Sequence, residues 1–300
     1  MGEAVSRKAL TWAIMRRVLR FIYWYSRKYL GGHGRGRLRF VRRADEIIRS
    51  VLKSDFNYVL GHRMYLDSKD SNKLSFNEVY EYLVTELVQK EVKMGNVVLD
   101  IGAHIGYYTL MFAKQVGPLG NVFAFEPEPD NFAILEKNVR VNGYQNVTVI
   151  QKAVSDRRDR TGLYLDDLGS GDNRIYDSHD GRRSLEVETI RLDDYFAGDR
   201  GNIDFIKMDI QGAEYAALCG MANLLKRNKG VKLVTEFWPF VLAMNGVAPQ
   251  AYLQLLIGHG FRLYNMDERF GRILPTSLPE LLAAYTIENQ HQTNLFCTRG

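Results

Sequence analysis

The chain has 300 residues, of which 46% are hydrophobic and 25% charged, as in a soluble globular protein with a sizeable core. Its two cysteines, Cys219 and Cys297, form no C-x-x-C pair, so neither a disulfide framework nor a structural zinc site is indicated, and we expect a cytoplasmic protein. Residues 1–50 hold 13 of the 40 basic residues and 3 of the 35 acidic ones, which leaves 27 basic and 32 acidic residues in the rest and excludes a basic catalytic body.

Residues 5–30 are predicted to form a basic amphipathic helix. An apolar stripe opposes Arg16, Arg20 and Arg27, and contains Ile14, Val18, Phe21, Ile22, Tyr25 and Tyr29. The charges recur too often for a transmembrane helix, and no signal-peptide cleavage site follows. Two interpretations stay open: the helix lies on an anionic membrane surface at the cytoplasmic face, or it packs on the body with a solvated basic face.

The rest of the chain divides into a linker, a lead-in and a large α/β domain. Residues 31–43 are rich in Gly and Arg and complete an N-terminal segment 1–43, residues 44–94 are a helical lead-in, and 95–300 form the main domain. Helices are predicted at 78–91, 107–115, 130–141, 213–226 and 249–258. Strands are predicted at 97–101, 121–125, 147–151, 204–208, 231–237, 261–265 and 293–297. This alternation predicts a mainly parallel sheet covered on both faces.

Polar residues or glycines follow the predicted strands. In an open α/β sheet, ligands bind beyond the carboxyl ends of the strands. Those positions hold Gly102-Ala103-His104, Glu126, Ala153, Asp209 and Glu236 in strand order. We therefore expect a ligand site at this edge of the sheet.

The loop after the first strand of the domain excludes the common phosphate motifs. A dinucleotide loop reads G-x-G-x-x-G, and His104 occupies its second glycine position; no G-K-[ST] follows, as a P-loop would need. Asp100, Gly102 and Gly106 remain, and Glu126 follows Asp100 by 26 residues, where an acid can accept both ribose hydroxyls. A free ribose without phosphate is typical of S-adenosylmethionine, whose carboxylate suits amides near a helix N-terminus.

Four stretches resemble, in order, the motifs of FkbM-type S-adenosylmethionine-dependent methyltransferases: LDIGAHIGYYTL, FEPEPDNFAILEKN, TIRLDDYF and FIKMDIQGAE. The resemblance implies a class I methyltransferase fold, a Rossmann-like three-layer sandwich with a seven-stranded, mainly parallel sheet whose last strand is antiparallel. It also implies O-methylation of a hydroxyl. Two positions depart from the family pattern, since His104 replaces a usual Asn and Gln211 replaces a usual acid.

The expected cofactor contacts lie in the first loop and at the following strand ends. They are Asp100, Gly102, Ala103, His104, Gly106, Tyr107, Glu126, Pro127, Ala153 and Asp209. Asp209 and Glu236 are the candidate bases for a hydroxyl proton, with desolvation expected to raise the pKa of Asp209. With no third ligand at a useful spacing, no metal is expected.

The interval 156–199 is predicted to be a polar loop that selects the substrate. Ser170, Asp172 and Asn173 are its candidate contacts, and Trp238 is either a sugar-stacking or a core aromatic residue. The leading hypothesis is O-methylation of a sugar, glycan, glycolipid or related hydroxylated metabolite. The alternatives are a nucleic-acid methyltransferase that uses the basic arm, which the acidic body disfavours, and a non-catalytic cofactor-binding protein at a membrane.

Overall fold

A computed structural model describes residues 56–299 apart from 76, 78, 167–169, 178, 180 and 199–201. The predicted amphipathic helix at 5–30 and the linker at 31–43 lie outside the described residues. Within them, no helix combines the length and apolar character needed to cross a bilayer.

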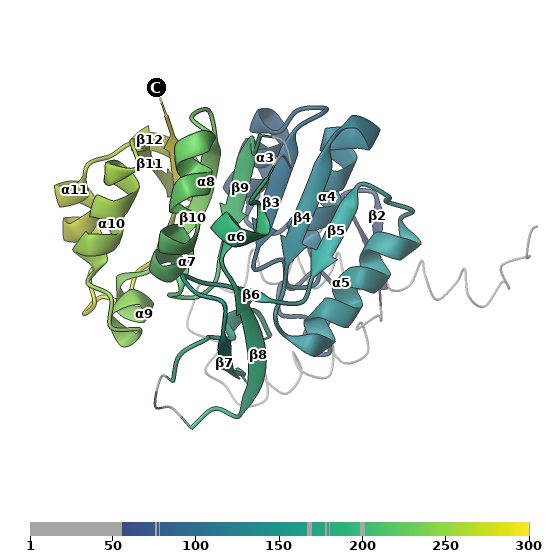
Figure 1. Ribbon diagram of the computed structural model, residues 1–300, viewed down its shortest axis with the longest axis horizontal. Coiled ribbons are helices and arrows are strands. Elements are labelled where there is room, and N and C mark those ends of the chain that lie inside the picture. The colour runs from purple at the N-terminus through teal and green to yellow at the C-terminus, as the bar shows by residue number, and fades with distance from the viewer. Residues whose placement is uncertain are drawn as a thin grey trace, which may run out of the picture.

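The main sheet is mainly parallel and contains an inserted antiparallel strand. Within the described residues it contains eight strands in the order β12-β11-β13-β10-β9-β3-β4-β5 (Figure 1). Neighbours from β10 to β5 are parallel, while β13 runs antiparallel between β10 and β11. The strands are β3 (Val97–Ile101), β4 (Asn121–Phe125), β5 (Val147–Ile150), β9 (Phe205–Met208), β10 (Lys232–Phe237), β11 (Arg262–Asp267), β12 (Arg272–Pro275) and β13 (Thr293–Thr298).

The predicted fold class is therefore confirmed, with one strand added. Seven of the eight strands were predicted, and β12 is the eighth. β12 pairs with β11 through a turn that contains Gly271, and its side chains are largely exposed at the sheet edge. Because an exposed edge strand carries little apolar patterning, its sequence gives a weak signal.

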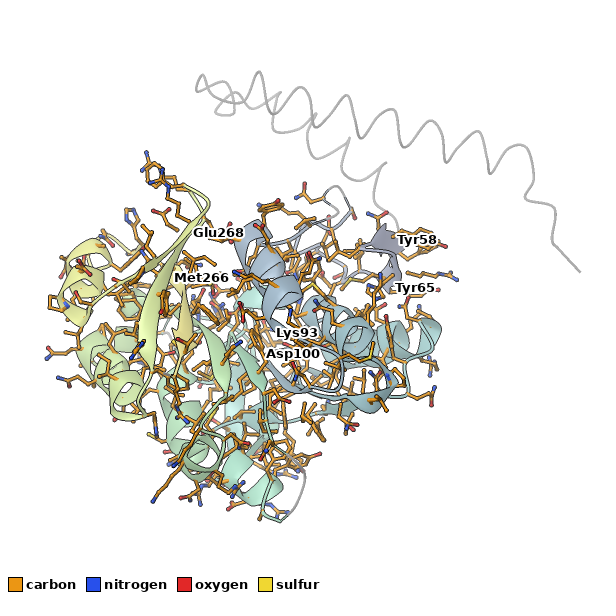
Figure 2. The ribbon with its side chains drawn as sticks, turned by 90° about the horizontal axis from the view of Figure 1, so that it is seen from above. Tyr58, Tyr65, Lys93, Asp100, Met266 and Glu268 are labelled. Carbon is orange, nitrogen blue, oxygen red and sulfur yellow. The ribbon has the colours of Figure 1, made fainter. Side chains whose placement is uncertain are left out.

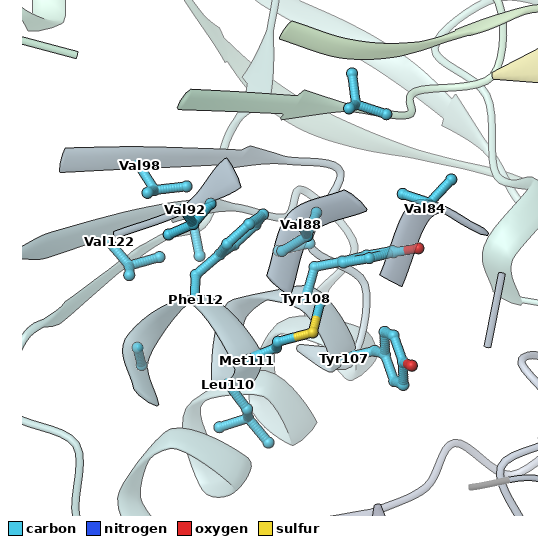
Figure 3. Close-up of a cluster of buried hydrophobic side chains, with 14 of the residues drawn as sticks. Val84, Val88, Val92, Val98, Tyr107, Tyr108, Leu110, Met111, Phe112 and Val122 are labelled. Atoms are coloured by element: carbon cyan, nitrogen blue, oxygen red, sulfur yellow. The ribbon is translucent and has the colours of Figure 1, made fainter. Parts of the chain in front are cut away.

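Helices cover both faces of the sheet. Val98 of β3 packs with α3, α4 and α5, and Leu99 packs on the opposite face, because successive strand residues point to opposite sides. Figure 3 shows the first layer, where Phe112 of α4 lies near Val92 and Val122. The first layer contains α3 (Tyr82–Glu91), α4 (Tyr107–Val116) and α5 (Pro129–Val141). The second contains α6 (Leu192–Tyr195), α7 (Glu214–Gly220), α8 (Ala222–Arg227), α9 (Pro239–Met244), α10 (Pro249–Gly258) and α11 (Leu278–Ala284).

The sequence predicted a helical lead-in at 44–94, but its described part is not helical throughout. Its described part begins with a hairpin of β1 (Phe56–Val59) and β2 (His62–Tyr65), and Tyr58 and Tyr65 mark this hairpin in Figure 2. Leu60 and Gly61 both have positive φ, the turn that matches the twist of two short strands. The hairpin is held by Asn138 of α5, whose side chain accepts a hydrogen bond from the Tyr65 amide at 2.6 Å and donates one to its carbonyl at 2.9 Å.

The interval at 156–199 was predicted as a polar loop and instead contains paired strands. β7 (Arg160–Tyr164) and β8 (Ser184–Ile190) are antiparallel, and β6 (Ala153–Val154) pairs with β8. Leu163 and Val187 pack with Ala153 in a small core of their own. Figure 1 shows β7 and β8 projecting from the main body. Many residues of β7 and β8 are polar because both strands have exposed faces. The strands therefore lack the apolar alternation by which a strand is predicted.

Candidate functional site

The candidate site lies at the point in the sheet where the order of successive strands reverses, between β3 and β9. From β3 the chain proceeds through β4 to β5 on one side and then returns to β9 and β10 on the other, so the carboxyl ends of β3 and β9 adjoin. Ligands of open α/β sheets bind at this switch point. The backbones touch here: a Cβ on Gly102, which has φ +82, would lie 2.0 Å from the Asp209 carbonyl oxygen. Glycine is therefore required at 102.

The loop from Gly102 to Gly106 is held by its own backbone bonds. The amides of Gly102 and Ala103 donate to the Phe125 carbonyl at 3.0 and 2.9 Å. Gly106 has φ +94, and a Cβ there would lie 2.7 Å from a methyl of Leu135. His104 has φ +51, and its amide donates to Glu126 Oε2 at 2.8 Å. These interactions link the loop to β4 and α5.

Glu126 is buried at the end of β4 and accepts two backbone hydrogen bonds. Besides the His104 amide on Oε2, the Glu128 amide donates to Oε1 at 3.0 Å. Burial raises the pKa of Glu126 to about 7, although these hydrogen bonds act to lower it. The Asn131 side chain also acts to lower this pKa through a hydrogen bond. A carboxylate has about four acceptor positions, so these partners leave room for a ligand.

A pocket of about 560 Å³, solvent at its mouth included, opens at this edge. Of the predicted site residues, it is lined by Gly102, His104, Glu126, Pro127, Ala153, Ser170, Asn173 and Asp209. Six larger apolar side chains also line it: Ile101, Phe125, Val154, Leu163, Ile175 and Ile210. Lys152, Gly171, Gln211 and Ala213 complete the lining. A mostly apolar pocket with a few convergent polar groups is typical of a small-molecule site.

Other predicted cofactor residues lie away from the lining. Asp100 is buried in β3, where Oδ2 accepts a hydrogen bond from Thr109 at 2.5 Å and Oδ1 has no partner. Burial raises the pKa of Asp100 to about 6. Tyr107 lies on α4, and its hydroxyl accepts the Tyr80 amide at 3.1 Å and lies 3.0 Å from the Thr85 hydroxyl. Figure 3 shows Tyr107 beside Tyr108 on this helix, so its ring belongs to the contact with α3.

Ser170 closes one side of the pocket through contacts with three segments. Its hydroxyl lies 2.6 Å from His104 Nε2 and donates to Asp67 Oδ2 at 3.1 Å. Its amide donates to the Ser71 hydroxyl at 2.8 Å, and its carbonyl accepts from Asn131 at 3.3 Å. We call Ser170 with His104, Asp67, Ser71 and Asn131 the Ser170 clamp. It joins the β7–β8 insert to the cofactor loop and the lead-in.

The remaining predicted substrate residues have protein partners. Asp172 forms ion pairs with Arg174 and Arg182 at 2.9 and 3.1 Å. Asn173 Oδ1 accepts the Asp166 amide at 2.9 Å while lining the pocket. The Trp238 indole donates to the Gln290 carbonyl at 3.1 Å, and its ring lies 5.9 Å from the Arg174 guanidinium.

Asp209 has a lowered pKa, which corrects the sequence expectation. Lys207 Nζ lies 2.9 Å from Oδ2, and the Gln211 side chain donates to Oδ1 at 2.9 Å. Burial acts to raise the pKa of Asp209, but the Lys207 ammonium and these hydrogen bonds outweigh it. Asp209 is therefore ionised and paired, which makes it a weak base. Its partner Gln211 has φ +54, in the turn between β9 and α7.

A second buried carboxylate lies on the neighbouring strand. Glu236 is 7% exposed, and Oε2 is a buried oxygen without a hydrogen-bond donor. Burial, followed by the charges of Asp209, Glu214 and Glu81, raises its pKa well above the ordinary value. Glu214 itself accepts the Ile210 and Gly212 amides at 3.0 and 2.9 Å and shapes the turn after β9.

Two polar members of this region were missed in the sequence. Lys207 lies inside β9, and Glu81 lies just before α3, where it accepts a hydrogen bond from the Tyr108 hydroxyl at 2.7 Å. A lysine inside a strongly apolar strand is a usable signal, because a buried ammonium requires an acidic partner. Glu81 has no comparable signal. Among the described residues, no group of three or more His, Cys, Asp and Glu side chains is placed to hold a metal.

Comparison with known proteins identifies the family. The FkbM methyltransferase domain matches residues 100–263, more than half of the chain. The chain belongs to the FkbM methyltransferase family. It is therefore an S-adenosylmethionine-dependent methyltransferase, and the pocket at the switch point of its sheet lies within the matched residues.

This methyltransferase matches different shares of the length of its relatives. The 2-O-methyltransferase NoeI of Sinorhizobium fredii is 29% identical over 57% of this chain and 75% of its own. The hexuronic acid methyltransferase AglP of Haloferax volcanii is 28% identical over 48% of this chain and 57% of its own. A crystal structure of a methyltransferase FkbM from Methylobacillus flagellatus has 17% identity and a TM-score of 0.42, covering 67% of this chain and 43% of that one.

Proposed function

We propose that this methyltransferase methylates a hydroxyl group of a sugar, a glycan or a related hydroxylated metabolite. The observation that carries the proposal is Glu236 Oε2, a buried carboxyl oxygen without a hydrogen-bond partner. It lies on β10, which pairs with β9, and Asp209 directly after β9 lines the pocket. An unpaired buried acceptor is costly unless a ligand supplies a donor. A hydroxyl supplies such a donor and is also the group to be methylated.

The residues at the switch point fit the nucleoside part of S-adenosylmethionine. The acceptor positions of Glu126 that its protein partners leave open suit the ribose hydroxyls. Gly102 lines the pocket at the loop, where the absence of a side chain lets the chain approach the Asp209 carbonyl. His104, Pro127 and Ala153 would contact the nucleoside from the pocket wall. When bound, the cofactor supplies an electrophilic methyl group on a sulfonium.

The work of the protein is then to orient the acceptor hydroxyl and to accept its proton. We assign the proton to Glu236, because a carboxylate with a raised pKa is a stronger base once ionised than Asp209, whose pKa is lowered. Asp209 holds Lys207 instead, and together they fix the polar wall beside Glu236. Orientation contributes much of the acceleration in a transfer of this kind.

The name of one relative supports methylation of an oxygen, and the name of another supports a sugar as the acceptor class. NoeI is a 2-O-methyltransferase, and AglP methylates a hexuronic acid. The site adds carboxylate, amide and ammonium groups within a small region, which suits an acceptor with several hydroxyls. A purely apolar acceptor would leave these groups without partners.

The test is a methylation assay with defined sugars. The full chain is incubated with S-adenosylmethionine and a panel of methyl glycosides of hexoses, deoxyhexoses and hexuronic acids, and mass spectrometry detects the added methylene mass. We expect at least one product, and we expect Glu236→Gln to lower kcat by about 10²–10⁴-fold, the contribution of a positioned base. Glu136→Gln, an exposed acid on α5, is the matched control.

Two results would contradict the proposal. If no sugar of the panel is methylated, the proposed sugar acceptor is wrong. Full activity of Glu236→Gln would remove the assigned proton acceptor. Binding of S-adenosylhomocysteine, measured by isothermal titration, checks that each variant still holds the cofactor product.

A further inference from the structure

Glu81 is a strained acidic residue that faces the site from outside the family domain. It lies just before α3 with φ +44, a left-handed conformation that is uncommon for a residue with a side chain. Its carboxylate accepts the Tyr108 hydroxyl on Oε2 at 2.7 Å and the Asn294 amide on Oε1 at 3.2 Å. Strain of this kind concentrates at functional sites.

The partners of Glu81 place it beside Glu236. Asn294 of β13 is the cross-strand partner of Glu236 of β10, and directly opposed side chains share one face of a sheet. Lys207 lies on that face too, because its ammonium is 4.8 Å from the centre of the Tyr108 ring. Glu81 therefore closes, from α3, the same polar region that Glu236 closes from the sheet.

The unpaired oxygen of Glu236 is an independent sign that a ligand enters this region. Glu236 is 93% buried, yet its Oε2 atom has no hydrogen-bond partner. The side-chain amide of Asn294, on the adjacent strand β13, donates to Glu81 instead. Lys207, the ammonium of the region, pairs with Asp209 at 2.9 Å. The region thus combines carboxyl oxygens of Glu81 and Glu236 with the Lys207 ammonium, and a hydroxyl of an acceptor molecule can donate to the oxygens and accept from the ammonium.

We propose that Glu81 binds a second hydroxyl of the acceptor, next to the one that Glu236 binds, and so acts as a specificity residue for an acceptor with neighbouring hydroxyls. This inference rests on the proposed sugar acceptor. Glu81 lies before the residues matched by the family domain, 100–263. The lead-in thus contributes to acceptor choice, while the common domain holds the cofactor.

The experiment separates acceptor binding from cofactor binding. The full chain, saturated with S-adenosylhomocysteine, is titrated with the methyl glycosides of the panel by isothermal calorimetry and saturation-transfer NMR. We expect Glu81→Gln to raise the Kd of the best glycoside at least tenfold and to leave the Kd of S-adenosylhomocysteine within twofold. Glu86→Gln, exposed one turn along α3, should change neither constant.

Deoxy analogues of the best glycoside add a second readout. In the wild type, removal of the hydroxyl that Glu81 binds should weaken binding, and in Glu81→Gln the same removal should have little further effect. Equal glycoside binding by wild type and Glu81→Gln would overturn the role of Glu81 alone. Loss of S-adenosylhomocysteine binding in Glu81→Gln would also overturn it, because Glu81 would then serve the fold or the cofactor. A wild type that binds no glycoside would overturn the sugar acceptor itself.

Discussion

Two carboxylates that line the same pocket, Asp209 and Glu126, have pKa values shifted in opposite directions, and their hydrogen-bond partners explain the difference. Asp209 lies 2.9 Å from an ammonium, which lowers its pKa against the effect of burial. Glu126 has neutral donors, the backbone amides of His104 and Glu128 and the side chain of Asn131, and burial raises its pKa to about 7. A charged partner within hydrogen-bond distance outweighs desolvation, whereas these neutral donors do not.

The shift of Glu126 predicts how cofactor binding depends on pH. A raised pKa means that part of the unliganded protein holds a protonated Glu126 below about pH 7. Ribose hydroxyls donate to the ionised form, so we expect the Kd of S-adenosylhomocysteine to fall as pH rises from 6 to 8, by several-fold. Isothermal titration across this range measures the change.

Glu126→Gln supplies the control for this pH dependence. The amide does not titrate, so the variant should bind S-adenosylhomocysteine more weakly and lose the tightening between pH 6 and 8. If the variant kept the same pH profile as the wild type, another group would be responsible, and Glu126 would not be the ribose acceptor.

At the scale of elements, the β7–β8 insert is linked to the cofactor loop by the Ser170 clamp. The clamp uses the hydroxyl, amide and carbonyl of one residue, and its partners come from the lead-in, the loop after β3 and α5. His104, the position where the family usually has Asn, contributes the shortest of these contacts at 2.6 Å. The insert therefore covers the pocket as long as these bonds hold.

Ser170→Ala is expected to accelerate cofactor release. The change removes the hydroxyl bonds to His104 and Asp67, and a hydrogen bond of this kind contributes about 1 kcal/mol. We expect the dissociation rate of S-adenosylhomocysteine, measured by stopped-flow displacement, to rise about five- to tenfold. Ser184→Ala, at an exposed position of β8, is the matched control. An unchanged rate would mean that the clamp does not gate the pocket.

At the scale of the whole molecule, charge is divided between an N-terminal segment and an acidic body. Residues 1–50 carry a balance of +10, and the rest of the chain, with 27 basic and 32 acidic residues, carries −5. We propose that the basic face at residues 5–30 binds an anionic membrane surface, which would hold the enzyme near lipid-linked acceptors. This proposal rests on the sequence pattern, since residues 5–30 lie outside those that the structure describes.

Substitution of the basic face tests the membrane proposal with the full chain. Each arginine near an anionic surface contributes about 1 kcal/mol, so replacing Arg16, Arg20 and Arg27 by Gln should weaken vesicle binding by roughly a hundredfold. Co-sedimentation with phosphatidylserine vesicles measures the change, with phosphatidylcholine vesicles as the neutral comparison. Replacing the exposed body residues Arg140, Arg157 and Arg158 should have no such effect. Equal binding by both triple variants would contradict the proposal.

The sequence by itself determined the main sheet and the location of the ligand edge. Strongly apolar strands alternating with amphipathic helices predict a parallel sheet, and this pattern is local enough to read without a structure. The loop at Gly102–Gly106 and the acid at Glu126 could be paired because both directly follow strands that neighbour one another. The hairpins β1–β2 and β7–β8 and the edge strand β12 were missed because short, exposed strands carry weak periodicity.

Only the tertiary structure decided which charged groups meet. Lys207 and Asp209 are close in sequence, but Glu81, Glu236 and Asn294 come from three separate elements, and no local pattern indicates that they adjoin. Their approach depends on how α3 packs on the sheet and on the antiparallel insertion of β13. The pKa of a buried group depends on its nearest charges, so the roles of Asp209 and Glu236 could be assigned only after those neighbours were placed.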